Sequence, residues 1–503
     1  MKNILVIMIW AAITITVNAQ TNVHGGIYNN TTWTLANSPY VVTDTIVVFP
    51  GVTLTIEPGV TVKFEDGKYV EVRQGSLIAS GTASDSITIT SNSASPTKGI
   101  YRGFVFNNPV AITTDYCIFK YADNPLAYCC FTIDTLFIQH SYFYMNTRCT
   151  SGNYSMTFIN QSTFENNTYC IEYSPYLISV HNSLFQNNIN CFGDYHTEEV
   201  SNLTLDSCTF INNAIAAHIN NTCLVTNCLL SNNTIGLNLE SGSSFANNTI
   251  KNSTFCNNGS GITSLYNNST NSDTLINCNF FNNGAAYHSM VAYMAGNIFT
   301  DNNSAVDFNI RSTDSIFNNY IFHNNIGINY RGGASSTFFN NYICNNTYNI
   351  NYITSLNGTI PPVCYCETDS ATIRSKIYDG YEDIARGLLD FTPYVNCDSS
   401  VINVIPPISC PAVVITDVSE GKLPSKPMME IFPNPATNAF TIKNLSSNEK
   451  MLLQIVNSIG EVVYTETLYG DKEHLIKANF SRGIYFVKVN EHERIVIGKL
   501  VIE

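Results

Sequence analysis

Two side chains in the middle of this sequence, those of His288 and Asp307, could together carry out acid–base chemistry. Each occupies the one polar position of a short segment whose other residues are small or apolar, and similar segments recur along the chain. If these segments are strands on successive turns of one structure, their polar positions point outward and form a column. We expect this outward column to contain Glu172, Gly193, His218, Asn238, Thr263, His288, Asp307, Asn329 and Asn351. His288 and Asp307 would then be neighbours; the simpler interpretation is a solvated polar face that happens to include two histidines.

A second polar group lies between Asp194 and Glu199 and includes His196. Insertions on one face of a repeat structure often bind ligands. Carboxylates beside a histidine could also hold a metal ion, but their spacing fits no calcium-loop motif. We therefore predict neither a metal site nor a cofactor, and an exposed turn is the simpler interpretation.

Tyr142 and Tyr144 flank Phe143 and are expected to point outward together. Their rings could stack on the apolar faces of sugars, although the preference of tyrosine for strands explains them equally well. The candidate ligand-binding residues are therefore His218, Tyr142, Tyr144, Asp194 and His196.

Basic residues are scarce between residues 115 and 360, where the sequence has only Lys120, Arg148, Lys251, Arg311 and Arg331. A polysaccharide lyase needs a basic residue beside an acidic cluster that binds calcium, because the cation screens the carboxylate of the substrate. None of these residues has such a cluster nearby in the sequence, and the Gly-His-Gly and Arg-Ile-Lys motifs of pectin hydrolases are absent.

The elements that must position these side chains are repeats of Phe-x-Asn-Asn. Clear copies begin at Phe164, Phe185, Phe210, Phe255 and Phe280, and looser copies centre on Phe119, Phe143, Leu230, Phe299, Ile321 and Ile343. The mean step is about 22 residues, a period typical of stacked units. A leucine-rich consensus and a helical periodicity are both missing, so the units are predicted to be short strands.

The predicted fold class is all-β, a right-handed parallel β-helix followed by a small Ig-like β-sandwich. One coil cannot bury its own apolar side chains, but stacked coils share a continuous core. Inward Phe, Ile and Leu would stack at the strand spacing of about 4.8 Å. Asn suits the corners because it tolerates left-handed backbone, and stacked amides can bond along the axis.

The opening coils carry a family resemblance. Residues 51–64 alternate strictly between apolar and polar and turn at Pro58-Gly59, and two further short strands follow at residues 75–82 and 87–90. This run resembles the N-terminal coils of secreted, pectate-lyase-like β-helix proteins. The later repeats resemble the carbohydrate-binding and sugar-hydrolase β-helix repeat. The resemblance covers roughly residues 45 to 360 and implies the fold more strongly than the function.

The predicted β-helix spans residues 20–363, and residues 364–418 are predicted to form its C-terminal cap. Residues 371–378 favour two helical turns with Ser370 as the N-cap, and residues 387–394 favour a closing strand. The segment from Ile377 to Ile384 resembles one that closes other secreted β-helices. Residues 419–428, with Pro424 and Pro427, are predicted to be a linker.

The cysteines divide into two groups. Cys117, Cys208, Cys228 and Cys278 lie two residues before the repeat's aromatic position, where other coils have serine, so they are expected to point inward and stay unpaired. Cys364, Cys366, Cys397 and Cys410 flank the cap, where few core contacts are available. We predict at least one disulfide among these four, tying the cap to the last coil.

The last part of the chain, residues 429–503, contains short motifs in a fixed order. Pro433, Asn434 and Pro435 come first, a turn with Gly460 follows, then Gly483 and Tyr485 within Gly-Ile-Tyr-Phe, and finally Lys499. This order resembles the type A C-terminal sorting domain of the type IX secretion system. The resemblance implies the type IX machinery as a partner and passage across the outer membrane of a Gram-negative cell, to the cell surface or beyond it.

The other end of the chain agrees with export. Residues 1–19 have a short basic start, an apolar stretch and a small-residue site at Val17-Asn18-Ala19, which predicts a signal peptide cut after Ala19. No later segment is apolar enough for a transmembrane helix. The net charge of -14 disfavours nucleic acid and anionic membranes as partners. A monomer is expected.

These observations favour an exported β-helix protein that binds polysaccharide or acts in adhesion, by analogy of fold. A carbohydrate-active enzyme, either a polysaccharide lyase or a glycoside hydrolase, that uses His288 and Asp307 is the alternative. A structural spacer at the cell surface is a third possibility.

Overall fold

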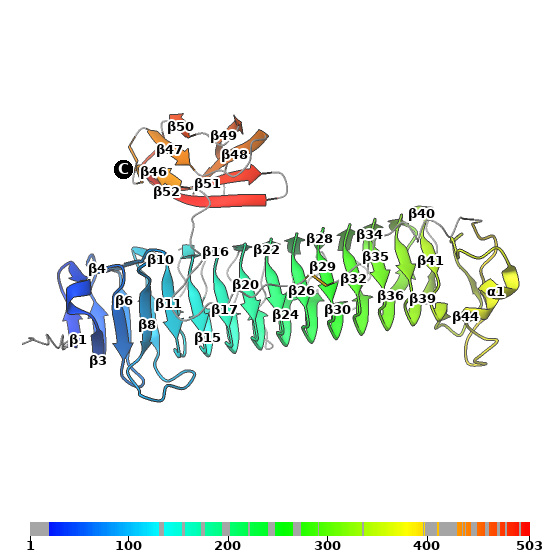
Figure 1. Cartoon of the computed structure of the whole chain (residues 1–503), viewed down its shortest axis with the longest axis horizontal. Coiled ribbons are helices and arrows are strands. Elements are labelled where there is room, and N and C mark those ends of the chain that lie inside the picture. The colour runs from blue at the N-terminus through cyan, green and yellow to red at the C-terminus, as the bar shows by residue number, and fades with distance from the viewer. Residues whose placement is uncertain are drawn as a thin grey trace, which may run out of the picture.

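The computed structural model consists of an elongated parallel β-helix and a small antiparallel β-domain near the C-terminus (Figure 1). It describes residues 20–502 apart from residues 130–134, 153–155, 173–176, 194–201, 220–221, 240–246, 265–272, 290, 334–336, 396, 398–409, 412–429, 435, 438, 444–449, 458–461, 470–472, 478–479 and 492–493. The predicted signal peptide and linker lie outside the described residues.

Each regular coil contains three strands that stack in parallel on those of the next coil. The first strand of each coil belongs to a 14-stranded sheet: β2 (Thr31–Trp33), β4 (Thr53–Ile56), β7 (Ser76–Ser80), β10 (Ala111–Asp115), β13 (Thr135–Gln139), β16 (Met156–Asn160), β19 (Leu177–His181), β22 (Asn202–Asp206), β25 (Thr222–Thr226), β28 (Thr249–Lys251), β31 (Asp273–Ile276), β34 (Val291–Ala295), β37 (Ser315–Phe317) and β40 (Thr337–Phe339).

The second and third strands of each coil belong to one 29-stranded sheet. The second strands are β11 (Cys117–Lys120), β14 (Tyr142–Tyr144), β17 (Thr163–Glu165), β20 (Leu184–Gln186), β23 (Thr209–Ile211), β26 (Leu229–Ser231), β29 (Thr254–Cys256), β32 (Asn279–Phe281), β35 (Ile298–Thr300), β38 (Tyr320–Phe322) and β41 (Tyr342–Cys344). The third strands are β12 (Leu126–Cys129), β15 (Arg148–Ser151), β18 (Tyr169–Glu172), β21 (Asn190–Phe192), β24 (Ile215–Ile219), β27 (Ile235–Leu239), β30 (Ser260–Thr263), β33 (Ala285–His288), β36 (Ser304–Ile310), β39 (Ile326–Gly333) and β42 (Tyr348–Tyr352). The opening coils add β1 (Thr21–Ile27), β3 (Tyr40–Val48), β5 (Thr61–Phe64), β6 (Tyr69–Arg73), β8 (Ile87–Ser91) and β9 (Gly103–Asn107).

The aromatic residue of the repeat fills the core. Phe143, Phe164 and Phe185 are fully buried, and successive rings stack at 4.8 and 4.7 Å between centroids. This spacing equals the strand spacing because each ring sits on the same position of the next coil. The predicted parallel β-helix with a continuous apolar core is confirmed.

The two asparagines of the repeat have different roles. The first, as at Asn212, adopts the left-handed conformation with φ 56° and turns the corner. The second, as at Asn213, is buried, and its Nδ2 donates to Phe185 O on the preceding coil and to Asn233 Oδ1 on the following coil, at 2.9 and 3.0 Å. The buried asparagines therefore form a ladder along the axis, which satisfies backbone groups that the corners would otherwise leave without partners.

The cap begins after β42 and contains β43 (Gly358–Thr359), α1 (Ser370–Ser375), β44 (Ile377–Tyr378) and β45 (Leu389–Asp390). β44 continues the large sheet by pairing Ile377 with Ile350. The prediction of Ser370 as N-cap was wrong by one residue. Asp369 is the N-cap, because its carboxylate accepts from the backbone N–H groups of Ala371 and Thr372.

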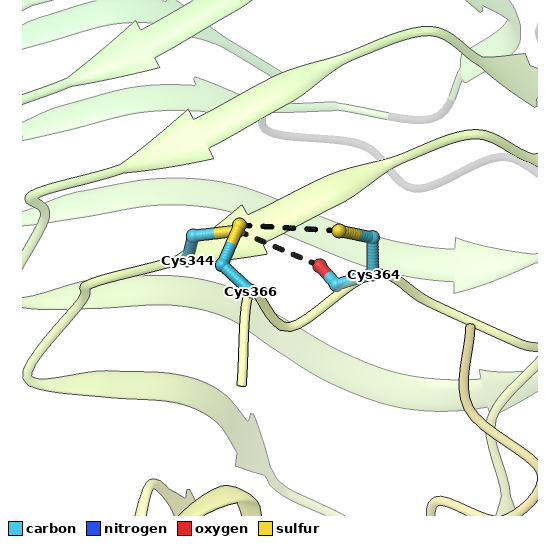
Figure 2. Close-up of side chains that lie close together, drawn as sticks. All are labelled: Cys344, Cys364 and Cys366. Atoms are coloured by element: carbon cyan, nitrogen blue, oxygen red, sulfur yellow. Dashed lines mark hydrogen bonds between the residues drawn. A yellow bond between two sulfur atoms is a disulfide. The ribbon is translucent and has the colours of Figure 1, made fainter. Parts of the chain in front are cut away.

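Two disulfides lie at the cap end, and Figure 2 shows the one between Cys344 and Cys366. Cys364 pairs with Cys397, which confirms a disulfide among the four cap cysteines. The other two of the four pair with cysteines of the coils, in Cys344–Cys366 and Cys256–Cys410. Among the described residues the unpaired cysteines are all buried: Cys117, Cys149, Cys170, Cys191, Cys208, Cys223, Cys228 and Cys278.

The C-terminal domain has a core of its own. One sheet has three strands, β46 (Glu430–Phe432), β47 (Ala439–Lys443) and β50 (His474–Lys477), and the other has four, β48 (Lys450–Asn457), β49 (Val462–Tyr469), β51 (Gly483–Glu491) and β52 (Arg494–Ile502). All strand pairs within these two sheets are antiparallel. Two small antiparallel sheets around one core fit the predicted Ig-like sandwich.

Candidate functional site

The outward column lies on the third strands of the coils. The register pairs His218 with Asn238, Asn238 with Thr263, and Thr263 with His288. Further along the axis, it pairs Asp307 with Asn329, Asn329 with Asn351, and Asn351 with Tyr378 of the cap. Side chains from successive coils therefore lie about 4.8 Å apart in one line.

His288 and Asp307 lie next to each other in this column. Nδ1 of His288 is 3.5 Å from Oδ2 of Asp307, and the side chains are 44% and 11% exposed. Arg331 completes the group, because its Nε and Nη2 donate to the two oxygens of Asp307 at 3.0 and 2.9 Å. This bidentate pair raises the pKa of the Arg331 guanidinium. Asp307 is thus covered and held by Arg331, whereas the sequence predicted a side chain in open solvent.

The arrangement limits what this group can do. Both oxygens of the Asp307 carboxylate already accept hydrogen bonds from Arg331, so neither can take a proton from a substrate without breaking that pair. The exposed edge of His288 and the remaining N–H groups of Arg331 are available as hydrogen-bond donors. The geometry therefore suits binding better than acid–base catalysis.

The column continues as a hydrogen-bonded chain of amides toward the cap. Asn329 donates from Nδ2 to Ser304 Oγ at 2.9 Å and accepts at Oδ1 from Asn351 Nδ2 at 2.6 Å. Asn351 in turn accepts from Arg386, whose guanidinium lies 4.6 Å from the ring centroid of Tyr378. No pattern in the sequence points to Arg386, because it reaches the column from a cap segment 35 residues beyond Asn351.

The other end of the column holds an ion cluster. Arg148 bonds to Glu172 on the next coil through Nε and to Asp123 on the preceding coil through Nη1, the latter at 3.0 Å. Glu172 is 5% exposed, so it too is covered although its strand position faces outward. No acidic residue stands close to Arg148 in the sequence, and only the stacking of coils brings these charges together.

The remaining candidate ligand-binding residues are scattered. His218 lies in the column and is partly exposed. Tyr142 faces outward but is only 6% exposed, and its hydroxyl donates to Glu165 Oε2 at 2.6 Å. Tyr144 is partly exposed, packs edge-on against Tyr121 and stacks on Tyr142 with 5.9 Å between ring centroids, so the two rings lie on one side of the strand as expected but partly cover each other. Asp194 and His196 lie outside the described residues.

Metal-ligating side chains meet at one place in the described part of the chain. The sulfur atoms of Cys344, Cys364 and Cys366 lie within 4.8 Å of one another. These cysteines are all in disulfides, and a disulfide sulfur is not a thiolate ligand. The cluster is therefore a cross-link between the cap and the last coil.

The motif residues of the C-terminal domain have distinct settings. Pro433 and Asn434 are exposed directly after β46. Tyr485 is buried on β51, and its hydroxyl donates to Ser481 O at 2.8 Å. Gly483 begins β51 and Lys499 lies on β52, while Pro435 and Gly460 lie outside the described residues.

Two family models match parts of the chain, one at the opening coils and one at the C-terminal domain. Residues 430–503 match the family described as a secretion system C-terminal sorting domain, and residues 25–113 match the pectate-lyase like beta helix domain. No curated protein was found to match. The chain is also similar to the Acinetobacter phage vB_ApiP_P1 tailspike protein, with 12% identity over 91% of this chain and 71% of that chain and a TM-score of 0.20, which is too low to support an argument.

The sorting domain decides where the protein acts. It directs type IX-dependent export to the cell surface or the extracellular space, and it implies contact with the secretion machinery. Within the part of the chain that the structure describes, no helix has the length and apolar character to span a membrane.

Proposed function

We propose that this exported parallel β-helix protein binds an extended, uncharged polysaccharide along the outward column, as a monomer, in adhesion or glycan capture at the cell surface. The observation that carries the proposal is the continuous polar line from His288 through Asp307, Asn329 and Asn351 to Tyr378. Its regular repeat of about 4.8 Å suits a regular linear polymer lying along the axis. A sugar chain is such a polymer, and its hydroxyls both donate and accept.

The charge of the column supports an uncharged ligand. Arg331 is compensated by Asp307, and Arg386 is compensated by Asp383 at 3.1 Å. The chain as a whole carries a net charge of -14, which repels polyanions. Amide, imidazole and guanidinium donors remain available for the hydroxyl groups of a sugar. The Tyr378 ring beside them can contact the apolar face of a sugar.

A glycan array with the purified protein tests the proposal. We expect binding to neutral, extended glycans, and R331Q should weaken that binding about tenfold, because a hydrogen bond to a charged group contributes about 1.5 kcal/mol or more. R311Q is the matched control, since Arg311 pairs with Asp314 in the turn after β36 and is not a column residue. A reducing-end assay on bound glycans separates binding from cleavage.

The outcomes distinguish the functions. Equal binding by R331Q, R311Q and the parent protein would place any glycan site elsewhere. New reducing ends that disappear in His288→Ala would favour a carbohydrate-active enzyme. Binding to no glycan would leave a rigid surface spacer as the function.

A further inference from the structure

A serine, a histidine and an aspartate come together on the 14-stranded sheet. Ser179 and His181 are both on β19, two residues apart, so their side chains leave the same face of the strand. Asp206 lies in register with His181 on β22 of the next coil. The three residues therefore meet without any contribution from the outward column, which is on the other sheet.

The hydrogen-bond directions within this group are those of a nucleophile, a base and a positioning acid. Oγ of Ser179 is 2.9 Å from Nε2 of His181, and Nδ1 on the other side of the ring faces Oδ2 of Asp206 at 3.6 Å. Both Nδ1 and Oδ2 are buried and have no other hydrogen-bond partner. Because a carboxylate can only accept, the tautomer with the proton on Nδ1 fits best, and it leaves Nε2 free to take the serine proton.

The aspartate is held in its charged form. Oδ1 of Asp206 accepts from Thr226 Oγ1 at 2.7 Å and from Asn227 Nδ2 at 3.1 Å. Burial acts to raise the pKa of Asp206, but the nearby His181 and the hydrogen bonds from Thr226 and Asn227 outweigh it, and the pKa is lowered. The gap of 3.6 Å to His181 is slightly long for a hydrogen bond, as is common in active sites without substrate.

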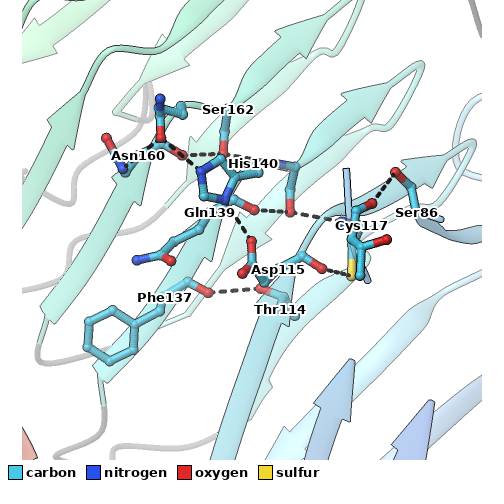
Figure 3. A network of polar contacts seen from close by, with 12 residues as sticks. Ser86, Thr114, Asp115, Cys117, Phe137, Gln139, His140, Asn160 and Ser162 are labelled. Carbon is cyan, nitrogen blue, oxygen red and sulfur yellow. Dashed lines mark hydrogen bonds and ion pairs between the residues drawn. The ribbon is translucent and has the colours of Figure 1, made fainter. Parts of the chain in front are cut away.

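A second histidine, His140, shows that a histidine between a serine and an aspartate is not a general feature of the coils. His140, at the corner after β13, has Nδ1 at 2.9 Å from Asp115 Oδ1 (Figure 3). Its Nε2 is 2.8 Å from Gln161 Oε1. Both of its ring nitrogens are therefore occupied by carboxylate and amide groups, and its ring stacks on Tyr116 at 4.3 Å. Only His181 of these two presents a ring nitrogen to a serine.

The three residues differ in burial in the way that acyl transfer requires: the base and its acid are buried, and the nucleophile is partly exposed. His181 and Asp206 are 4% and 2% exposed, so bulk solvent is largely excluded from the base and its partner. Ser179 is partly exposed on the open face of the sheet. A reacting group can therefore reach the serine oxygen.

We propose that Ser179 and His181 are the nucleophile and base of an esterase site in which Asp206 positions the imidazole. Ser179 Oγ bonds to the carbonyl carbon of an ester, and its proton passes to Nε2 of His181. The tetrahedral intermediate then breaks its bond to the alcohol oxygen, which leaves as an alcohol with the proton from His181. Water attacks the acyl-serine and gives a proton to His181, and the serine oxygen leaves and regains that proton as the carboxylic acid is released.

The surroundings indicate an ester carried on a long molecule. Phe158 lies in register with Ser179 on the preceding coil and Thr204 on the following coil, and both are partly exposed. Phe158 stacks on Phe137 at 5.4 Å and forms an apolar surface beside the serine. The Thr204 hydroxyl, in register with Ser179 on the next coil, could donate to the oxyanion. A flat sheet face admits a polymer that bears a small acyl group, such as an acetylated sugar chain, more readily than it encloses a small molecule.

The test uses the full exported protein, a fluorophosphonate probe and p-nitrophenyl acetate. We expect one covalent adduct, mapped to Ser179 by mass spectrometry, and a loss of about 100-fold in ester hydrolysis in S179A. H181Q should also lose the adduct. H140Q is the matched control and should keep both adduct and hydrolysis, because His140 faces no serine.

Ser179 faces outward, so S179A should melt at the temperature of the parent protein and remain informative even where H181Q, in a buried position, does not fold. R331Q should leave the labelling unchanged, which separates this site from polysaccharide binding at the outward column. Absence of an adduct on Ser179 in the parent protein, or full hydrolysis by folded S179A, would overturn the proposal.

Discussion

The coils and the cap of this β-helix bury their polar groups in different ways. In the coils the buried polar side chains are mostly neutral amides and hydroxyls that repeat from turn to turn, and the thiols there are mostly free. In the cap, Asp379 is fully buried against Arg374 at 2.8 Å, and disulfides join the chain to itself and to the last coil. A repeating structure supplies each polar group with a partner from the next coil, whereas its end must supply partners in another way.

The end of the asparagine ladder shows this most directly. Asn346 is the last ladder residue, and no further coil offers it an amide. Its backbone N–H and its Nδ2 instead donate to Oδ1 of Asn349 at 3.2 and 3.0 Å. Asn349 occupies the position at which the preceding coils have Gly327 and Ala305, so one substitution within the coil replaces the missing neighbour.

The largest effect is expected from breaking the ladder within the coils. Asn258→Ala removes an oxygen that accepts from Asn233 N and Nδ2 and an Nδ2 that donates to Leu230 O and Asn283 Oδ1. Because these buried groups lose a partner, we expect a loss of about 4 kcal/mol in the free energy of unfolding. Asn325→Ala, at an exposed amide, is the control and should cost less than about 0.5 kcal/mol. Urea unfolding of both variants decides; similar midpoints would mean that the ladder adds little.

The cap should respond to loss of its disulfide where the coils do not. Replacing Cys364 and Cys397 with Ala opens a link across 33 residues, and we expect a loss of about 3 kcal/mol. Hydrogen exchange should show the loss in the cap alone, because distant coils contact only their own neighbours.

Cys208→Ser is the matched control for a coil cysteine. Serine fills the same position at Ser183 and Ser253, so we expect a change below about 1 kcal/mol. Faster exchange throughout the coils in the double cap variant would contradict the separation between the two regions.

The sequence predicts the structure of the coils much better than the contacts of the cap. The repeat predicts the parallel β-helix, the inward Phe and Cys positions and the corner asparagines, because the same pattern of residues recurs in every coil. The register of the outward column follows from the same period. The sequence could not predict Arg331 on Asp307, Arg386 on Asn351 or Cys256 on Cys410, because these contacts join different coils, or a coil and the cap, outside the repeated motif.

The site on β19 and β22 was missed for a related reason. Ser179 and His181 stand on the first strand of their coil, and the motifs that mark the period lie on the second and third strands. Asp206 lies beside them only because of the strand register between their coils, and the coil between His181 and Asp206 differs in length from its neighbours. A search for acids in register with each outward histidine, coil by coil, would have found it.

A buried carboxylate in the coils, that of Asp273, should make their stability sensitive to pH. Asp273 is 1% exposed and bonds to the neutral groups Asn248 and Ser289, each at 2.8 Å. Burial raises the pKa of Asp273 to about 6, against the hydrogen bonds that lower it. The folded state therefore holds the proton more tightly than the unfolded state, whose pKa is about 3.9.

The stability from this group is complete below about pH 4 and is lost as the pH rises through about 6. We expect a decrease of about 2 kcal/mol between pH 4 and 7 in the parent protein. Asp273→Asn keeps the shape and can still bond to Asn248 and Ser289, so it should remove this decrease. Unfolding of both proteins across that range is the measurement, and an unchanged pH profile in the variant would assign the effect to other groups.

The smallest effect is expected at the end of the ladder, where Asn349→Ala tests the substitution that replaces a missing coil. The variant removes the acceptor for Asn346 N and Nδ2, and we expect a loss of about 1 to 2 kcal/mol. The loss should be smaller than that of Asn258→Ala, because Asn258 also donates to two groups, whereas Nδ2 of Asn349 has no partner to lose. Alanine also fits the space, since Ala305 occupies the same position in an earlier coil. A loss as large as that of Asn258→Ala would mean that the last coil holds the cap in place through this one amide, and that the two regions are less independent than their chemistry indicates.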